Sequence, residues 1–139
     1  MKEPSKEIQQ KYMELQLIQH QLQQVQKQVQ ALDEQADEMD VVQQALADFS
    51  AAKPGSEMYV TVTPGVFAKA KLENNETVLL NVGAGAVVEK PVPDAKKIMA
   101  KQGTELRKMQ EELTEQLQKL AHRGEHLQSE LKKLIEKDV

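Results

Sequence analysis

The sequence predicts an α+β fold in which a long N-terminal and a long C-terminal helix form an antiparallel coiled coil, joined by two β-hairpins. Three observations lead to this fold class. Apolar residues near both ends of the chain recur every three or four positions, the spacing of a coiled-coil seam. Residues 54–93 alternate apolar and polar side chains between Pro, Gly and Asn turns. The two helical segments are also nearly equal in length, so they can pair along their whole extent.

The N-terminal helix is predicted over residues 1–53. Its seam alternates steps of three and four residues and then shifts by one position after Met39. Lys53-Pro54-Gly55 ends the helix, because proline lacks an amide donor and glycine suits a chain reversal. All seam positions except one, which is a lysine, are apolar: Ile8, Lys11, Leu15, Ile18, Leu22, Val25, Val29, Leu32, Ala36 and Met39, followed by Val42, Leu46 and Phe49.

The C-terminal helix is predicted over residues 94–139, with Asp94 as its N-cap after two prolines. Two successive four-residue steps between Met109 and Leu117 predict that the coil unwinds locally. Gly124 predicts a soft spot, because glycine costs about 1 kcal/mol relative to alanine in a helix. In an antiparallel pair of these helices, residues whose numbers add up to about 143 should lie level. The seam is Leu106, Met109, Leu113, Leu117, Leu120, Gly124, Leu127, Leu131 and Leu134.

Residues 54–93 are predicted to form two consecutive β-hairpins that serve as an oligomerisation platform. The strands are expected at 58–63, 66–72, 77–82 and 86–90, separated by Pro, Gly and Asn turns. A sheet this small buries too little apolar surface alone, and its edges leave backbone groups unpaired. We therefore expect hairpins of several subunits to assemble into an inter-subunit β-barrel. The residues expected to pack there are Val60, Val62, Leu72, Val78, Leu80, Val82 and Val88, and Leu79 and Val87 likewise need a partner.

Composition argues against several classes of function. The chain has no cysteine, which excludes disulfides, thiol catalysis and cysteine-ligated zinc. Aromatic residues make up only 3%, too few for a compact core with a deep catalytic cleft, and the net charge of −4 argues against nucleic-acid binding. No apolar run approaches the length of a membrane span. We expect a cytoplasmic protein that binds neither nucleic acid nor membrane.

One short motif suggests a metal site. His122-Arg123-Gly124-Glu125-His126 matches the spacing of a zinc-protease motif, with both histidines on one helical face. Catalytic zinc also needs a third ligand and an enclosed cavity, which a two-stranded coil does not supply. We interpret these side chains as solvated helix residues. The sequence therefore predicts no enzyme, no metal and no cofactor.

The order helix, two hairpins, helix, with Gly55-Ser56-Glu57-Met58 opening the strands and Val82-Gly83-Ala84-Gly85 before the last one, resembles the α-type subunit of prefoldin. The resemblance covers essentially the whole chain, and its strand block is the most specific part. It implies a hetero-hexamer with β-type subunits, two α-type and four β-type, built on a double β-barrel. It also implies ATP-independent capture of non-native polypeptides by coiled coils and their transfer to a group II chaperonin. A filament-forming relative of prefoldin is an alternative.

The chain ends carry apolar residues outside the seam. Between residues 19 and 38 every off-seam position except one alanine is polar, whereas Tyr12, Met13, Leu17 and Ile135 have no partner in a two-stranded coil. Exposed apolar patches usually mark binding surfaces, so we expect unfolded polypeptides to bind here. The predicted client-binding residues are Ile8, Tyr12, Met13, Leu15, Leu17, Leu127, Leu131, Leu134 and Ile135. The alternative is a structural tether, whose helices only space its partners and need no such patch.

Overall fold

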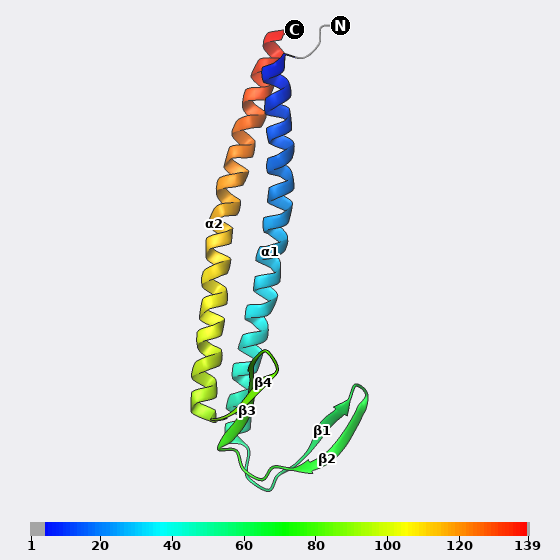
Figure 1. Ribbon diagram of the computed structural model, residues 1–139, viewed down its shortest axis with the longest axis vertical. Helices are drawn as coiled ribbons and strands as arrows, with labels where there is room; N and C mark the ends of the chain where they lie inside the picture. Colours follow the sequence, from blue (N-terminus) through cyan, green and yellow to red (C-terminus); the bar gives the residue numbers. More distant parts are fainter. Residues whose placement is uncertain (1–4, 139) are drawn as a thin grey trace. The chain divides into compact units, whose positions relative to one another are not determined.

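The computed structural model describes residues 5–138 and confirms two long helices with two antiparallel hairpins between them (Figure 1). Its contacts divide the chain into two compact units. The helical unit contains the chain up to residue 35 and from residue 106, and the hairpin unit contains residues 36–105. In chain order the elements are α1 (Lys6–Ala51), β1 (Glu57–Thr63), β2 (Val66–Lys71), β3 (Thr77–Gly83), β4 (Ala86–Pro91) and α2 (Val92–Asp138).

In the helical unit, α1 and α2 run antiparallel and pack through their apolar seams. The core cluster consists of Leu15, Ile18, Leu127 and Leu131, against which half-buried apolar residues pack. A side-chain hydrogen bond from Gln110 to Asp33 joins two residues whose numbers add up to 143, so the expected antiparallel register is confirmed. Burying such leucine and isoleucine side chains contributes about 1.5–3 kcal/mol each.

One predicted seam position is wrong. Met109 is 51% exposed, whereas Gln110 is half-buried and donates a hydrogen bond across the helices to Asp33. With Gln110 in the seam, α2 alternates steps of four and three residues without interruption from Leu106 to Leu134. The predicted local unwinding is therefore wrong as well. A polar side chain can occupy a half-buried position at little cost when its amide is hydrogen-bonded.

The ends of both helices in the hairpin unit differ slightly from expectation. α1 ends at Ala51, and the Asn75 side-chain amide donates to the backbone carbonyls of Ser50 and Ala52, at 2.8 and 2.7 Å. α2 begins at Val92, so Asp94 lies in its first turn and is not the N-cap. Val92 is 1% exposed, which anchors this start.

The two hairpins are copies of one structural pattern. In the first hairpin Glu57 pairs with Lys71, and in the second Thr77 pairs with Pro91, 20 residues further along in each strand. All other strand pairs, and the register shift near each turn, repeat with the same offset. Their environments differ, however. Leu80 is 8% exposed, whereas Val60, its counterpart in the first hairpin, is 42% exposed. The first hairpin thus leaves uncovered an apolar position that the second one buries.

Candidate functional site

The helical unit exposes apolar side chains near the ends of its two helices. Tyr12, Met13 and Leu17 of α1 and Ile135 of α2 are between 52% and 68% exposed. We call these four residues the terminal patch. On α1 no large apolar side chain between residues 18 and 40 is exposed. Val41, further along α1, and Met109 of α2 are also exposed, at 69% and 51%, but each is isolated on its helix, whereas Tyr12, Met13 and Leu17 lie within six residues of one another.

The remaining predicted client-binding residues lie elsewhere. Leu15, Leu127 and Leu131 are 6–8% exposed and form the core between the helices, so their assignment to a surface is corrected. Their positions in the seam account for this, because each seam side chain packs against the facing helix. Ile8 and Leu134 are half-buried. The terminal patch thus rests on a packed core and leaves four side chains free to make contacts.

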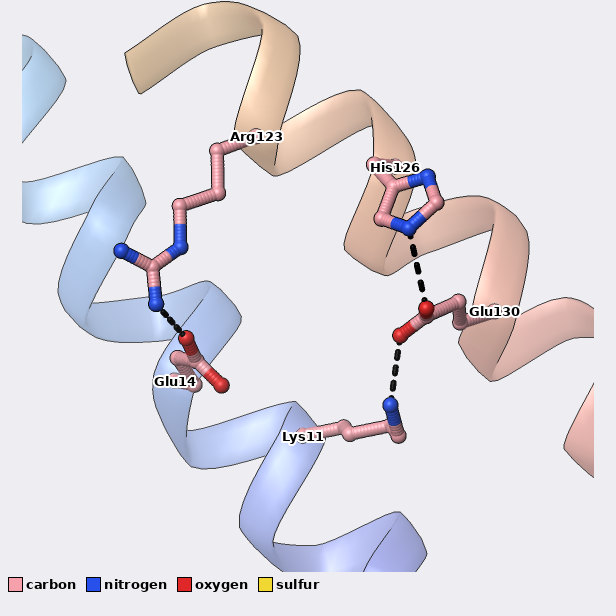
Figure 2. A network of polar contacts seen from close by, with 5 residues as sticks. All are labelled: Lys11, Glu14, Arg123, His126 and Glu130. Carbon is pink, nitrogen blue, oxygen red and sulfur yellow. Dashed lines mark hydrogen bonds and ion pairs between the residues drawn. The ribbon is translucent and has the colours of Figure 1, made fainter. Parts of the chain in front are cut away.

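Two ion pairs cross between the helices (Figure 2), and their α1 members, Lys11 and Glu14, are neighbours of Tyr12 and Met13 in the sequence. Lys11 of α1 contacts Glu130 of α2, and Arg123 of α2 contacts Glu14 of α1. The second oxygen of Glu130 contacts Nε2 of His126 (Figure 2), and these two atoms are 3.0 Å apart. Lys11 was predicted as the one charged seam position of α1, but its partner was not predicted. The signal for the partner is Glu130, a carboxylate close to the level of Lys11 in the antiparallel register.

The Lys11–Glu130 contact affects both ionisations. The hydrogen bond to Glu130 raises the pKa of Lys11 above its ordinary value of 10.5. The same hydrogen bond lowers the pKa of Glu130 below its ordinary value of 4.5. Both groups are therefore charged at neutral pH. Because they are accessible to water, their attraction is screened and contributes little to stability.

A second polar contact joins the helices far from the terminal patch in sequence. Arg107 Nη1 lies 2.8 Å from Asp33 Oδ1, and the Gln110 amide donates to the same oxygen at 3.2 Å. The hydrogen bonds from Gln110 and Arg107 lower the pKa of Asp33 below its ordinary value of 3.8. This contact provides a comparison for the ion pairs beside the terminal patch, because no exposed apolar cluster accompanies it.

The hairpins carry the other set of exposed apolar side chains. Of the predicted assembly residues, Val60, Val62 and Val82 are exposed and Val78 and Val88 are half-buried. Leu72 and Leu80 are buried within the chain itself, at 9% and 8%, so their assignment to a free assembly surface is corrected. Leu79 and Val87, which the sequence also marks as needing a partner, are 72% and 56% exposed. Three further residues are exposed that were not predicted to take part in assembly: Tyr59, Val66 and Phe67.

Tyr59 and Phe67 lie on the face of the first hairpin that strand alternation assigned to solvent. Tyr59 pairs with Lys69 and Thr61 pairs with Phe67, and Tyr59 and Thr61 are two residues apart on one strand, so Tyr59 and Phe67 share one face. Both faces of the hairpins thus expose apolar groups, and the signal was the presence of Tyr and Phe at positions expected to be polar. A sheet with two apolar faces needs cover on both sides.

The described residues offer no grouped metal ligands. Between residues 5 and 138, no three His, Asp or Glu side chains gather so that they could hold a metal ion. Over the same range, neither helix has an apolar stretch long enough to cross a lipid bilayer. His126, in the zinc-like motif, contacts Glu130 instead. The chemistry that the exposed surfaces offer is the burial of apolar side chains.

Comparison with known proteins finds relatives that match most of this chain. Residues 18–137 match the family model described as prefoldin subunit. The prefoldin subunit alpha of Archaeoglobus fulgidus is 26% identical over 126 residues, covering 91% of this chain and 92% of that protein. That of Thermofilum pendens is 28% identical over 95 residues, covering 68% and 74%. A filamentous PFD from Methanocaldococcus jannaschii, solved by cryo-electron microscopy, has a similar fold, with a TM-score of 0.75 and 18% identity over 83% of this chain and 95% of that one.

Proposed function

Because this chain belongs to the prefoldin family and is an α-type chaperone subunit, we propose that its terminal patch captures unfolded polypeptides. The observation that carries the proposal is the contrast along α1. Tyr12, Met13 and Leu17 are exposed together within six residues, whereas Val41 is the only large apolar side chain exposed on the rest of α1 as the structure describes it. Unfolded chains expose irregular apolar segments, and a flexible methionine adapts to many of them.

Capture by this surface needs no nucleotide. Full burial of one such side chain is worth about 1.5–3 kcal/mol, so a single subunit holds a client weakly and releases it readily. Several subunits joined in one complex bind the same client more tightly, because each further contact forms intramolecularly. We therefore propose an ATP-independent holdase whose strength comes from the number of its patches.

The hairpins are proposed to join this chain to other prefoldin subunits. Their exposed apolar residues and unpaired strand edges suit pairing with a second hairpin. The proposed complex contains two α-type and four β-type subunits, resides in the cytoplasm and passes its clients to a group II chaperonin. Native mass measured with and without a β-type subunit tests this stoichiometry. A native mass that fits a homo-oligomer or a filament would contradict the mixed hexamer.

Replacing the two outward residues of the terminal patch tests the capture proposal. In the assembled complex, Met13→Ser with Leu17→Ser should weaken binding of fluorescent, reduced and carboxymethylated α-lactalbumin by about tenfold or more, because two apolar contacts are lost. Met109→Ser is the matched control, since Met109 is also exposed on a helix of the same unit and lies outside the patch. Equal affinity of the double variant and the control would contradict capture and favour a structural tether.

A further inference from the structure

We infer that the ion pairs Lys11–Glu130 and Glu14–Arg123 set the register of the two helices and thereby position the terminal patch for capture. This inference rests on the proposed function of the patch. The two pairs cross between the helices in opposite directions: α1 supplies the cation in one and the carboxylate in the other. Each helix therefore presents both signs of charge to its neighbour. If each helix carried charges of one sign, opposite charges would still face each other after a shift in register. With both signs on each helix, only one register brings opposite charges together in both pairs.

An apolar seam does not define register uniquely. Its pattern repeats every seven residues, so sliding one helix by a heptad again brings apolar residues into contact. The charges disfavour that slide, because it replaces two screened attractions by contacts between like charges. A slip in one direction brings Lys11 level with Lys137 and Glu14 level with Glu130, and a slip in the other brings Lys11 level with Arg123. Like charges then face each other in both cases.

The packing beside the ion pairs favours the same register. Gly124 is buried against Ile18, and a Cβ built on it would lie 3.5 Å from Cγ2 of Ile18. There is room at this position for a methyl group at most. A heptad slip would place Leu131 or Leu117 against Ile18 in place of Gly124. The close approach at Gly124 and the two ion pairs thus select one alignment together.

The register matters for capture because the terminal patch draws on both helices. At about 100° per residue, Tyr12 and Ile135 project to the same flank of the helix pair, opposite the flank that carries Glu14, Glu130 and Arg123. One flank is joined by charges and the other carries Tyr12 and Ile135, while Met13 and Leu17 face away from the seam on α1. A heptad slip would move Ile135 by about 10 Å relative to Tyr12 and separate the parts of the patch.

The test combines a charge reversal with its compensating reversal. Glu130→Lys places a lysine opposite Lys11 and should reduce the affinity of the assembled complex for reduced, carboxymethylated α-lactalbumin about threefold. Adding Lys11→Glu restores an ion pair of opposite polarity, although not the His126 contact, and should recover the affinity. Asp33→Asn, which weakens the cross-helix contact to Arg107 and Gln110, is the control that should leave the affinity unchanged.

Register itself is measured as the distance between spin labels attached to Gln16→Cys and Gln128→Cys. Both positions are exposed, and the natural chain has no cysteine that would also be labelled. A single narrow distance is expected for the unmodified charges, a broadened or second distance for Glu130→Lys, and a single distance again for the compensated variant. The inference would be overturned if Glu130→Lys left the distances or the affinity unchanged, or increased the affinity. It would also be overturned if the compensated variant did not recover. Met13→Ser with Leu17→Ser, measured alongside, separates the two proposals: if this variant binds normally, the proposed function itself fails.

Discussion

The terminal patch and the hairpins both expose apolar side chains, but their backbones differ. The patch lies on helices, whose backbone groups are already hydrogen-bonded, so only side chains are available for contact. The hairpins are separate two-stranded sheets, with strand edges that offer backbone donors and acceptors beside apolar groups. Side-chain contacts alone suit weak and adaptable binding, whereas strand pairing with apolar burial suits stable assembly. The difference suggests why one chain can hold its subunits firmly and its clients loosely.

The largest expected effect comes from the hairpins. Val62→Asp with Val82→Asp places a charge on an exposed apolar position of each hairpin, so assembly would bury two unpaired carboxylates at a cost of several kcal/mol. We expect the complex to dissociate into smaller species, as measured by light scattering coupled to size-exclusion chromatography. Circular dichroism should show intact helices, because both positions are exposed in the single chain. An intact complex would show that the hairpins do not form the assembly surface.

The close approach of the helices at Gly124 should respond to side-chain size. Gly124→Leu should destabilise the helix pair by about 1–3 kcal/mol, because Ile18 leaves no room for the larger side chain. Gly124→Ala should stabilise it by about 1 kcal/mol, since its methyl group meets Ile18 at an ordinary contact distance. Urea unfolding measures both changes. Equal effects of the two substitutions would show that this contact is not tight, and a gain from alanine would identify Gly124 as the soft spot that the sequence predicts.

The smallest expected effect is the pH dependence of the ion pair beside the patch. The pKa of Glu130 is lowered in the folded state, so its contribution is present above about pH 4.5 and is lost as the pH falls through the lower folded value. The pKa of Lys11 is raised, so its contribution is lost only as the pH rises beyond 10.5. The small difference in Tm between the unmodified chain and Glu130→Gln should therefore shrink on acidification below pH 4.5. A difference that stays constant or grows would contradict the contact.

The hydrophobic period was enough to predict most of the fold. The seam from Ile8 to Met39 is buried or half-buried throughout, and the helices and strands differ from the predicted bounds only by a few residues at their ends. Met109 shows where hydrophobic periodicity fails. It was assigned to the seam because it is apolar, but the neighbouring Gln110 lies there and gains a hydrogen bond across the helices. Periodicity counts apolar residues and does not record which polar groups find partners.

The candidate site was predicted less completely than the fold. The exposure of Met13 and Leu17 follows from their place outside the seam, whereas Leu15 and Leu127 were included although their own seam positions bury them. The exposed Tyr59 and Phe67 were missed because strand alternation was taken to separate a buried face from a solvated one. In a chain that assembles with others, both faces can require cover, and a single sequence does not show the partner that supplies it.

Photo-crosslinking at Met13 tests the central claim most directly. A benzophenone amino acid at Met13 of the assembled complex is irradiated with guanidine-denatured luciferase as it is diluted into buffer, and the same group at Met109 serves as the control. The proposed capture predicts strong crosslinking to the unfolded protein from position 13, little from position 109, and none from either position to native luciferase. Equal yields from the two positions, or crosslinks from position 13 only to other subunits, would contradict the proposal that unfolded polypeptides bind at the terminal patch.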